Sequence, residues 1–260
     1  MLRIDANKLT LVYGSNTVVR DISFAIESGC ITGLVGPNGC GKSSIIKALS
    51  RVLAPQSGSI SYNGLNTAQL SCRELACLLG VVPQIPLLPS NFTAFEVVLM
   101  GRNPHLGLFQ YESSKDFEIV RRAMEQTRTQ HLAERRIGEL SGGEIQSVVI
   151  ARVLAQQTQG ILLDEPTSNL DIGRQTEVLD LMRDLCHRHG LMIGVVLHDL
   201  NLAVQYCDHM ILLNQGSIVA EGAPSQVVTP ENIRTVYGGG SAVYSIDGLP
   251  AVLPRAGSSV

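Results

Sequence analysis

Glycines, a lysine and a serine form a dense motif near the start of the chain. Residues 36–43 read Gly-Pro-Asn-Gly-Cys-Gly-Lys-Ser, with the spacing Gly-x-x-x-x-Gly-Lys-Ser, after an apolar run and before a helical one. Such glycines let backbone N–H groups turn onto phosphate oxygens, and the start of the helix adds partial positive charge. Lys42 should reach the β- and γ-phosphate oxygens of a nucleoside triphosphate, and the Ser43 hydroxyl is placed to ligate Mg²⁺. The nucleotide-binding residues expected here are Gly36, Pro37, Asn38, Gly39, Cys40, Gly41, Lys42, Ser43 and Ser44.

Cys40 is the cysteine within this motif. Lys42 and the start of the helix both favour a thiolate, which predicts a reactive side chain. A sulfur that packs inward without a chemical role is the alternative. For the motif as a whole, a glycine-rich turn without a ligand is the other interpretation, and the complete pattern in this context argues against it.

Two adjacent acids end a second apolar run, Ile161-Leu162-Leu163-Asp164-Glu165. A strand buried on both faces rarely ends in two carboxylates without a purpose, because each is costly to desolvate unpaired. Beside a phosphate site, Asp164 is suited to the Mg²⁺ shell and Glu165 to polarising a water molecule. Acids that are merely exposed at a strand end are the alternative.

A third motif, Leu140-Ser141-Gly142-Gly143-Glu144, opens a further helical run. Ser141 and Glu144 can form a capping box at its start. The same helix start has two glycines and no bulk, so it can also face a phosphate. The sequence therefore predicts a second anion-binding position at Ser141, Gly142 and Gly143.

Along the chain, short apolar runs alternate with helical runs, which is the pattern of a mainly parallel sheet covered by helices. A hairpin is expected over residues 210–220, and a helical subdomain is expected to be inserted at about residues 85–145, where a capping box occurs at Thr93 and Glu96. A domain of residues 1–240 and a short hairpin or tail of residues 241–260 complete the predicted organisation. The expected buried strands are Ile31–Val35, Leu78–Val82, Ile161–Leu163 and Met192–Leu197.

Composition and charge exclude several classes of function. Lys and Arg together number 20 against 23 Asp and Glu, a net charge of −3, so no nucleic-acid partner is expected. No apolar run reaches the roughly 18 to 20 residues that cross a bilayer. Residues 1–14 show no signal peptide, and the six cysteines include no Cys-x-x-Cys pair. A reduced, cytoplasmic protein is expected.

The Leu-Ser-Gly-Gly motif lies 23 residues before Asp164 (164 − 141 = 23) and resembles the signature motif of ATP-binding cassette (ABC) ATPases. The resemblance covers about residues 2–222 and implies roles for four further residues. Gln84 would join the Mg²⁺ and water network, and His198 would contact the γ-phosphate. Tyr13 would stack on adenine, with simple packing as the alternative. Asp171, in the loop of residues 168–171, would pair across a dimer.

The fold implied by this resemblance is α/β. It is a P-loop NTPase core of the ABC ATPase type, a mainly parallel sheet flanked by helices, with an antiparallel β subdomain and an inserted helical subdomain. The family binds ATP and Mg²⁺ between two copies, with the P-loop of one chain facing Ser141–Gly143 of the other. Two residues depart from the usual signature: Glu144 replaces a glutamine, and Ser147 stands where many members have an arginine, which puts any salt bridge from position 147 in doubt.

Residues 101–109 (Gly-Arg-Asn-Pro-His-Leu-Gly-Leu-Phe) resemble a stretch found in ATPase subunits of iron–siderophore, haem and cobalamin importers. That resemblance implies a subunit at the cytoplasmic face of the inner membrane, attached through a polytopic permease and served by a periplasmic or extracellular binding protein. A loop without bearing on cargo is the alternative for this stretch. Three other functions stay open: an importer ATPase for molybdate, tungstate or another cargo, a soluble ABC ATPase in assembly or repair, and a nucleotide-binding module that does not hydrolyse ATP.

Overall fold

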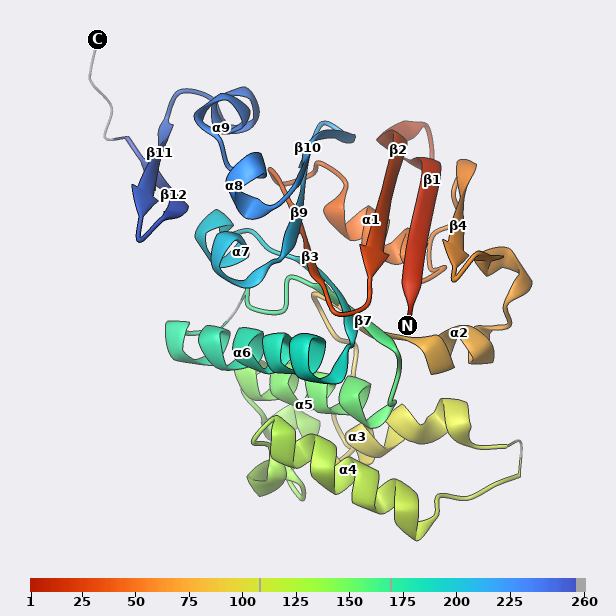
Figure 1. Ribbon diagram of the computed structural model, residues 1–260. Helices are drawn as coiled ribbons and strands as arrows, with labels where there is room; N and C mark the ends of the chain where they lie inside the picture. Colours follow the sequence, from red (N-terminus) through yellow and green to blue (C-terminus); the bar gives the residue numbers. More distant parts are fainter. Residues whose placement is uncertain (108, 169, 256–260) are drawn as a thin grey trace.

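The computed structural model describes residues 1–107, 109–168 and 170–255. A six-stranded sheet lies at its centre, with helices packed around it (Figure 1). The strand order is β10-β9-β3-β8-β7-β6, with β10 antiparallel to β9 and all other neighbours parallel. Three of these strands, β3, β7 and β8, are buried at every position, as expected for a parallel sheet covered on both faces. The strands are β3 (Ile31–Val35), β6 (Leu79–Val82), β7 (Gly160–Asp164), β8 (Met192–Val196), β9 (His209–Asn214) and β10 (Ser217–Gly222).

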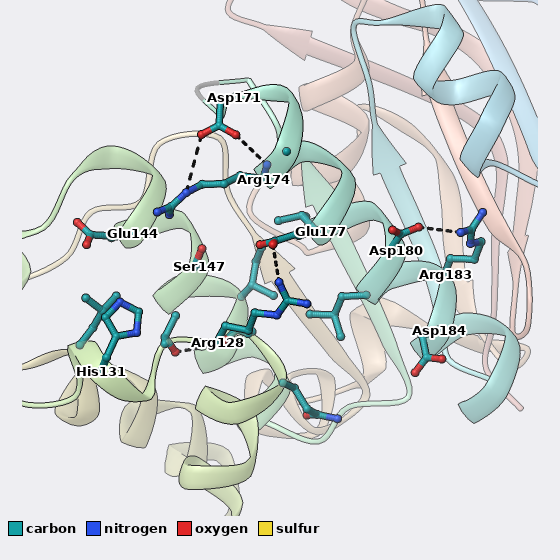
Figure 2. Close-up of a pocket in the computed structure, with 18 of the residues that line it drawn as sticks. Arg128, His131, Glu144, Ser147, Asp171, Arg174, Glu177, Asp180, Arg183 and Asp184 are labelled. Carbon is teal, nitrogen blue, oxygen red and sulfur yellow. Dashed lines mark hydrogen bonds and ion pairs between the residues drawn. The ribbon is translucent and has the colours of Figure 1, made fainter.

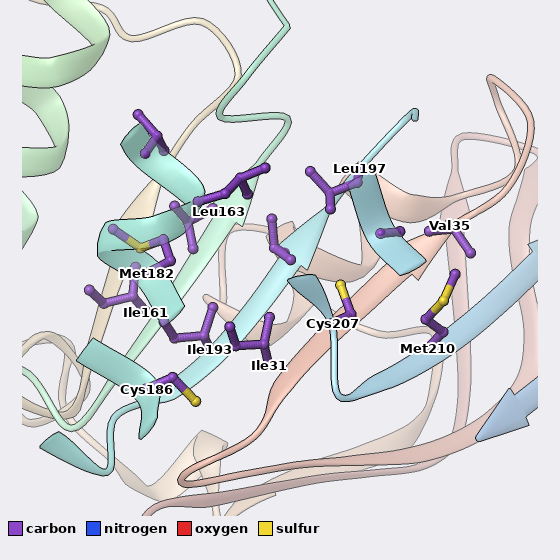
Figure 3. Close-up of a cluster of buried hydrophobic side chains, with 14 of the residues drawn as sticks. Ile31, Val35, Ile161, Leu163, Met182, Cys186, Ile193, Leu197, Cys207 and Met210 are labelled. Carbon is purple, nitrogen blue, oxygen red and sulfur yellow. The ribbon is translucent and has the colours of Figure 1, made fainter. Parts of the chain in front are cut away.

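One face of this sheet packs on helices α6 (Ile172–His189) and α7 (Leu200–Tyr206) through a large apolar cluster (Figure 3). Helix α6 contributes Val178, Met182 and Leu185 at helical spacing. It is followed by Gly190, which has the left-handed conformation φ 67°. The periodicity in the sequence and the glycine stop signal together explain both the buried stripe and the end of the helix.

The other face of the central sheet packs on an antiparallel sheet in the order β2-β1-β4-β5. This sheet is the antiparallel β subdomain that the family resemblance implied. Its two long strands are irregular, because the pairing register shifts between Ala6 and Leu9 and again between Leu9 and Leu11. Helix α1 (Lys42–Leu49) lies against the same cluster. The strands are β1 (Arg3–Tyr13), β2 (Asn16–Glu27), β4 (Ser57–Tyr62) and β5 (Leu65–Asn66).

Helices between β6 and β7 form a separate apolar cluster of their own. Two capping boxes, at Thr93–Glu96 and Ser141–Glu144, begin helices as the sequence predicted. Arg102 links two of these helices, because it donates hydrogen bonds to Asp116 of α4 (2.8 Å) and to the backbone oxygen of Ala155 at the end of α5 (2.7 Å). The elements are α3 (Ala94–Leu99), η2 (Met100–His105), α4 (Ser114–Gln126), η3 (Gln130–Leu132), η4 (Ile137–Glu139) and α5 (Gly142–Ala155), preceded by η1 (Thr67–Gln69) and α2 (Cys72–Leu78).

The C-terminal elements pack back onto the core. Helices α8 (Pro224–Val227) and α9 (Pro230–Tyr237) precede a hairpin of β11 (Ser241–Ile246) and β12 (Leu249–Pro254). Val252 is joined to Asn201 of α7 by two hydrogen bonds, of 2.8 and 3.2 Å. In the described part of the chain, no helix combines the length and the apolar character needed to cross a membrane. The predicted domain limits at residues 240 and 241 stay a prediction.

Candidate functional site

Four neighbouring strands deliver the predicted site residues to one edge of the central sheet. The glycine-rich loop follows β3, His198 follows β8, Asp164 and Glu165 end β7, and Gln84 follows β6. In the order β3-β8-β7-β6 these strands run parallel, so their carboxyl ends meet at the same edge. Ligands of open α/β sheets bind at this edge.

The loop between β3 and α1 has a backbone that only glycines can supply. Gly36 has φ 144°, and a Cβ there would lie 2.1 Å from the backbone oxygen of Leu213. Gly41 has φ 109°, and a Cβ there would lie 2.7 Å from Val19 of β2. The loop is thus clamped between β9 and the β1–β2 hairpin, which explains two of the glycines physically. Val18 and Val19, which wall the loop, belong to no motif and were not predicted.

Lys42 folds back over the loop. Its Nζ donates to the backbone oxygens of Gly36 (2.8 Å) and Pro37 (2.9 Å), and the residue is only 4% exposed. Both carbonyl bonds hold the ammonium group above the turn where the phosphates are expected. A buried cation whose partners are neutral carbonyls is well placed to accept an anionic ligand.

Ser43 and Asp164 are joined across the site. The Ser43 hydroxyl donates to Oδ1 of Asp164 at 2.9 Å. Burial raises the pKa of Asp164, and the neighbouring Glu165 adds to this, while the bond from Ser43 and the charges of Lys47 and Lys42 oppose it. A hydroxyl and a buried carboxylate oxygen side by side are hard oxygen ligands of the kind that Mg²⁺ takes.

Glu165 is held between the two residues that the family resemblance added. Its Oε2 accepts a bond from Nε2 of Gln84 at 2.6 Å, and its Oε1 lies 2.5 Å from Nε2 of His198. The backbone of Glu165 is left-handed, with φ 51°, a conformation that costs a non-glycine residue about 1–3 kcal/mol. Glu165 directly follows β7, so the chain leaves the extended conformation of the strand at the residue whose carboxylate meets Gln84 and His198.

Tyr13 lies at the end of β1, paired with Asn16 across the hairpin turn, and is 44% exposed. The same hairpin touches the glycine-rich loop through Val19 and Gly41. The ring of Tyr13 is thus exposed at the end of the hairpin that borders the loop. Its stacking on adenine stays a prediction.

The expected reactivity of Cys40 is wrong. The side chain is 4% exposed, and its sulfur lies close to Gly36 and 3.9 Å from Nζ of Lys42. Burial raises the pKa of the Cys40 thiol, and the nearby charge of Lys42 only partly offsets this. The inward-packing alternative therefore describes the residue.

Ser141 caps α5, and Gly142 and Gly143 are the first two residues of this helix. Ser141 and Gly142 are exposed, and Gly142 lines a small cavity of about 190 Å³ together with Gln84 and Ser168. Glu144 keeps the capping function of the usual glutamine, because its Oε2 accepts from the backbone N–H (2.8 Å) and hydroxyl (2.7 Å) of Ser141. These bonds lower the pKa of Glu144.

Ser147 replaces an arginine with a short side chain, whose hydroxyl donates to the backbone oxygen of Gly143 (3.0 Å). Ser147 lines a much larger cavity of about 1010 Å³ between α6 and the end of α4 (Figure 2). Its walls carry charge pairs such as Arg128–Glu177 (2.5 Å). Asp171 caps α6 at the rim, accepting from the backbone N–H of Arg174 (2.9 Å), and its side chain is 71% exposed. Asn169, in the same loop, lies outside the described residues.

The sequence profile of the ABC transporter family matches residues 19–168. That span contains the P-loop, Gln84, the signature residues and the Asp164–Glu165 pair. The chain belongs to the ABC transporter family. As an ABC ATPase it binds and hydrolyses ATP, and the fold class and enzyme class expected from its sequence are confirmed.

Relatives of this ABC ATPase cover almost its full length. The ferric enterobactin transport ATP-binding protein FepC of Escherichia coli (strain K12) is 40% identical over 254 residues, 97% of this chain and 94% of FepC. An inward-facing structure described as a metal-chelate type ABC transporter superposes with a TM-score of 0.83 at 28% identity, covering 98% of this chain and 97% of that one. A dimeric structure of the ABC transporter cassette MJ0796 superposes with a TM-score of 0.77 at 26% identity, covering 85% of this chain and 98% of that one.

Proposed function

We propose that this ABC ATPase powers the import of a metal chelate, of the iron–siderophore, haem or cobalamin kind, through a separate transmembrane permease. The observation that carries the hydrolytic part is the pair of contacts that Gln84 and His198 make with Glu165 next to the Ser43–Asp164 pair. The cargo class is supported by FepC, named for ferric enterobactin transport, and by the metal-chelate type transporter structure. These relatives favour chelate import over molybdate or tungstate uptake and over a soluble role in assembly or repair.

The P-loop binds the phosphates of ATP through its backbone N–H groups and Lys42, while Tyr13 stacks on the adenine. Lys42 gains the phosphate oxygens as partners in place of carbonyl oxygens. The oxygens of Ser43 and Asp164 fit Mg²⁺, with the side-chain carbonyl of Gln84 as a further ligand, since the amide Nε2 of Gln84 is the atom that contacts Glu165. When bound, Mg²⁺ neutralises the charge that develops on the phosphates.

Glu165 acts as the general base. As a water oxygen attacks the γ-phosphorus, Glu165 accepts the water proton, the bond to the bridging oxygen breaks, and ADP and phosphate form. His198 lies against one carboxylate oxygen and Gln84 against the other, so both orient the base toward the nucleotide. His198 also contacts the γ-phosphate.

Two copies of the chain complete the site. Ser141, Gly142 and Gly143 lie at an exposed helix start, where a phosphate of the ATP held by the partner would meet backbone N–H groups. Asp171, exposed at the start of α6, pairs across the same interface. The dimeric cassette structure supports this arrangement. Closure of the pair on ATP and its opening after hydrolysis would move the helices of the permease. The subunit would therefore lie at the cytoplasmic face of the membrane, where it contacts the permease. A binding protein would deliver the cargo on the other side.

Phosphate release from ATP tests the role of Glu165. Glu165→Gln keeps the size of the side chain and removes the basic charge, so hydrolysis with the permease should fall by roughly 10²- to 10⁴-fold while ATP still binds. Glu27→Gln, an exposed glutamate of β2, is the matched control and should hydrolyse ATP normally. Near-normal turnover in Glu165→Gln would remove Glu165 from the mechanism.

A further inference from the structure

Three side chains with different donor atoms meet at the edge of the central sheet opposite the P-loop. They are Cys186 and His187, in the last turn of α6, and Asp208, just before β9. The Cys186 sulfur, a ring nitrogen of His187 and a carboxylate oxygen of Asp208 all lie within 4.8 Å of one another. This edge carries the amino ends of β3 and β9, whereas the nucleotide site uses the carboxyl ends. The group therefore has no part in the ATP chemistry described above.

We propose that Cys186, His187 and Asp208 form a binding site for a divalent cation of the Zn²⁺ class. Thiolate, imidazole and carboxylate are the ligands of Zn²⁺, and a set that includes sulfur and nitrogen does not suit Mg²⁺ or Ca²⁺, which prefer oxygen. Three protein ligands leave a fourth position, and the side chains of His187 and Asp208 are 43% and 42% exposed, so water reaches it.

The distances are close to those of a tetrahedral site. Bond lengths of about 2.0–2.1 Å for nitrogen or oxygen and 2.3 Å for sulfur place neighbouring donors about 3.3–3.6 Å apart. His187 Nε2 lies 2.9 Å from Oδ2 of Asp208, so this pair has to open slightly. The sulfur has to approach the other two donors by at most about 1.3 Å to reach these separations.

Asp208 is already held in place for such a role. Its Oδ2 accepts the backbone N–H of Ile31 at 2.8 Å, and its own backbone N–H donates to the oxygen of Ile31 at 3.0 Å. Bonds of this kind orient carboxylate ligands in metal sites. His187 also lines the large cavity beside α6, which supplies a path from solvent to the site.

Cys186 approaches the site from the apolar core (Figure 3). Burial raises the pKa of its thiol to about 12, with smaller contributions from Asp208 and Cys30. A bound cation displaces the S–H proton, which is released to solvent. Cys207, next to Asp208 in sequence, is not part of the site, because its sulfur packs against Gly33 in the middle of β3.

A cation held here would tie the last turn of α6 to the starts of β3 and β9. At its other end α6 is capped by Asp171, the residue proposed above to pair across the dimer interface. The proposed site therefore fixes the helix that joins the interface to the far edge of the sheet. It does not depend on the proposed cargo or on the role of Glu165.

Zn²⁺ titration of the purified chain without nucleotide, in competition with a chromophoric chelator, tests the proposal. The wild type should bind one Zn²⁺ at this site. His187→Ala, at a half-exposed position that folding tolerates, should weaken that binding by at least about 100-fold, since losing even an outer-shell partner costs about 10- to 100-fold. His189→Ala, two residues away and exposed, is the matched control and should bind as the wild type does. Equal Zn²⁺ affinity in the wild type and His187→Ala overturns the proposal.

Co²⁺ provides a second readout that reports on the sulfur directly. Co²⁺ bound through Cys186 should show a near-ultraviolet sulfur-to-metal band, and Cys186→Ser should abolish it. Cys72→Ser, which removes an exposed cysteine of α2, should leave the band unchanged. Absence of the band in the wild-type protein, or its persistence in Cys186→Ser, overturns the assignment of the sulfur ligand.

Discussion

Loss of the buried ion pair between Arg102 and Asp116 should lower the free energy of unfolding by an amount that follows from its burial and its hydrogen bonds. The two side chains are only 7% and 10% exposed, and Nε of Arg102 donates to Oδ1 of Asp116 at 2.8 Å. Asp116→Asn keeps the size of the side chain but leaves the Arg102 charge buried without a carboxylate. Removing one partner of a buried pair costs about 3–5 kcal/mol. In Asp116→Asn, Arg102 retains its hydrogen bonds to Ala155 and to Gln157 (3.1 Å). We therefore expect the free energy of unfolding to fall by the lower limit of this range, about 3 kcal/mol.

The assay is urea unfolding followed by far-ultraviolet circular dichroism. With a slope of about 3 kcal/mol per molar urea, the midpoint of Asp116→Asn should fall by about 1 M. Asp180→Asn is the control, since Asp180 pairs with Arg183 at a similar distance of 2.7 Å, but with side chains 54% and 49% exposed. That exposed pair should contribute less than about 1 kcal/mol. Equal midpoint shifts in the two variants would refute the argument from burial.

The same pair predicts a pH dependence. Hydrogen bonds from Ser113, followed by the bond from Arg102, hold the pKa of Asp116 well below its ordinary value. A lowered pKa in the folded state means that Asp116 contributes its full stability above about pH 4 and loses it as the pH falls through the folded value. The difference in unfolding free energy between wild type and Asp116→Asn should therefore be constant from pH 5 to 8 and shrink at lower pH.

Three further predictions concern the site and its supports. A mixed dimer with Lys42→Ala in one chain and Ser141→Arg in the other should retain more bound ATP than a dimer with both changes in one chain, and equal nucleotide occupancy would contradict the shared site. Maleimide should label exposed Cys72 before buried Cys40, as mass spectrometry can show, and rapid labelling of Cys40 would contradict its burial. Gly101→Ala should lower the unfolding free energy by about 1–3 kcal/mol, because its Cβ would lie 2.2 Å from the backbone oxygen of Arg152, whereas Gly107→Ala, with its nearest neighbour 3.5 Å away, should not.

Parallel strands were the easiest elements to predict. β3 matches its expected limits, and β6, β7 and β8 differ from theirs by a residue at one or both ends, because strands buried on both faces read as continuous apolar runs. β1 and β2 could not be placed from the sequence. Their register shifts break the alternation of apolar and polar residues on which such a prediction depends.

Contacts between residues distant in sequence were harder to predict than motifs. The structure brings Gln84 and His198 to Glu165, as the family resemblance implied, but the bonds themselves depend on the left-handed backbone at Glu165. Inward packing of the Cys40 sulfur is one of the two interpretations that the sequence allows. Lys42 and the helix start favour the other, a reactive thiolate, but the burial of the thiol raises its pKa by more than the charge of Lys42 lowers it.

Arg102 lies in the stretch of residues 101–109 that resembles a stretch of the ATPase subunits of iron–siderophore, haem and cobalamin importers. Its contacts give this stretch a structural role, because they anchor the helical layer to the end of α5. Leu108, within the same stretch, lies outside the described residues. Neither the pairing of Arg102 with Asp116 nor the meeting of Cys186 with Asp208 has a local sequence signal, since each depends on how separate elements pack.

ATP-driven uptake into proteoliposomes tests whether hydrolysis at Glu165 powers the import of a metal chelate. The chain is reconstituted with its permease and binding protein, and radiolabelled ferric siderophore, haem, cobalamin and molybdate are offered in turn. We expect uptake of one of the three metal chelates with ATP, none of molybdate, and loss of uptake in Glu165→Gln but not in Glu27→Gln. Accumulation of molybdate alone, or undiminished chelate uptake in Glu165→Gln, would contradict the proposal that hydrolysis at Glu165 powers chelate import.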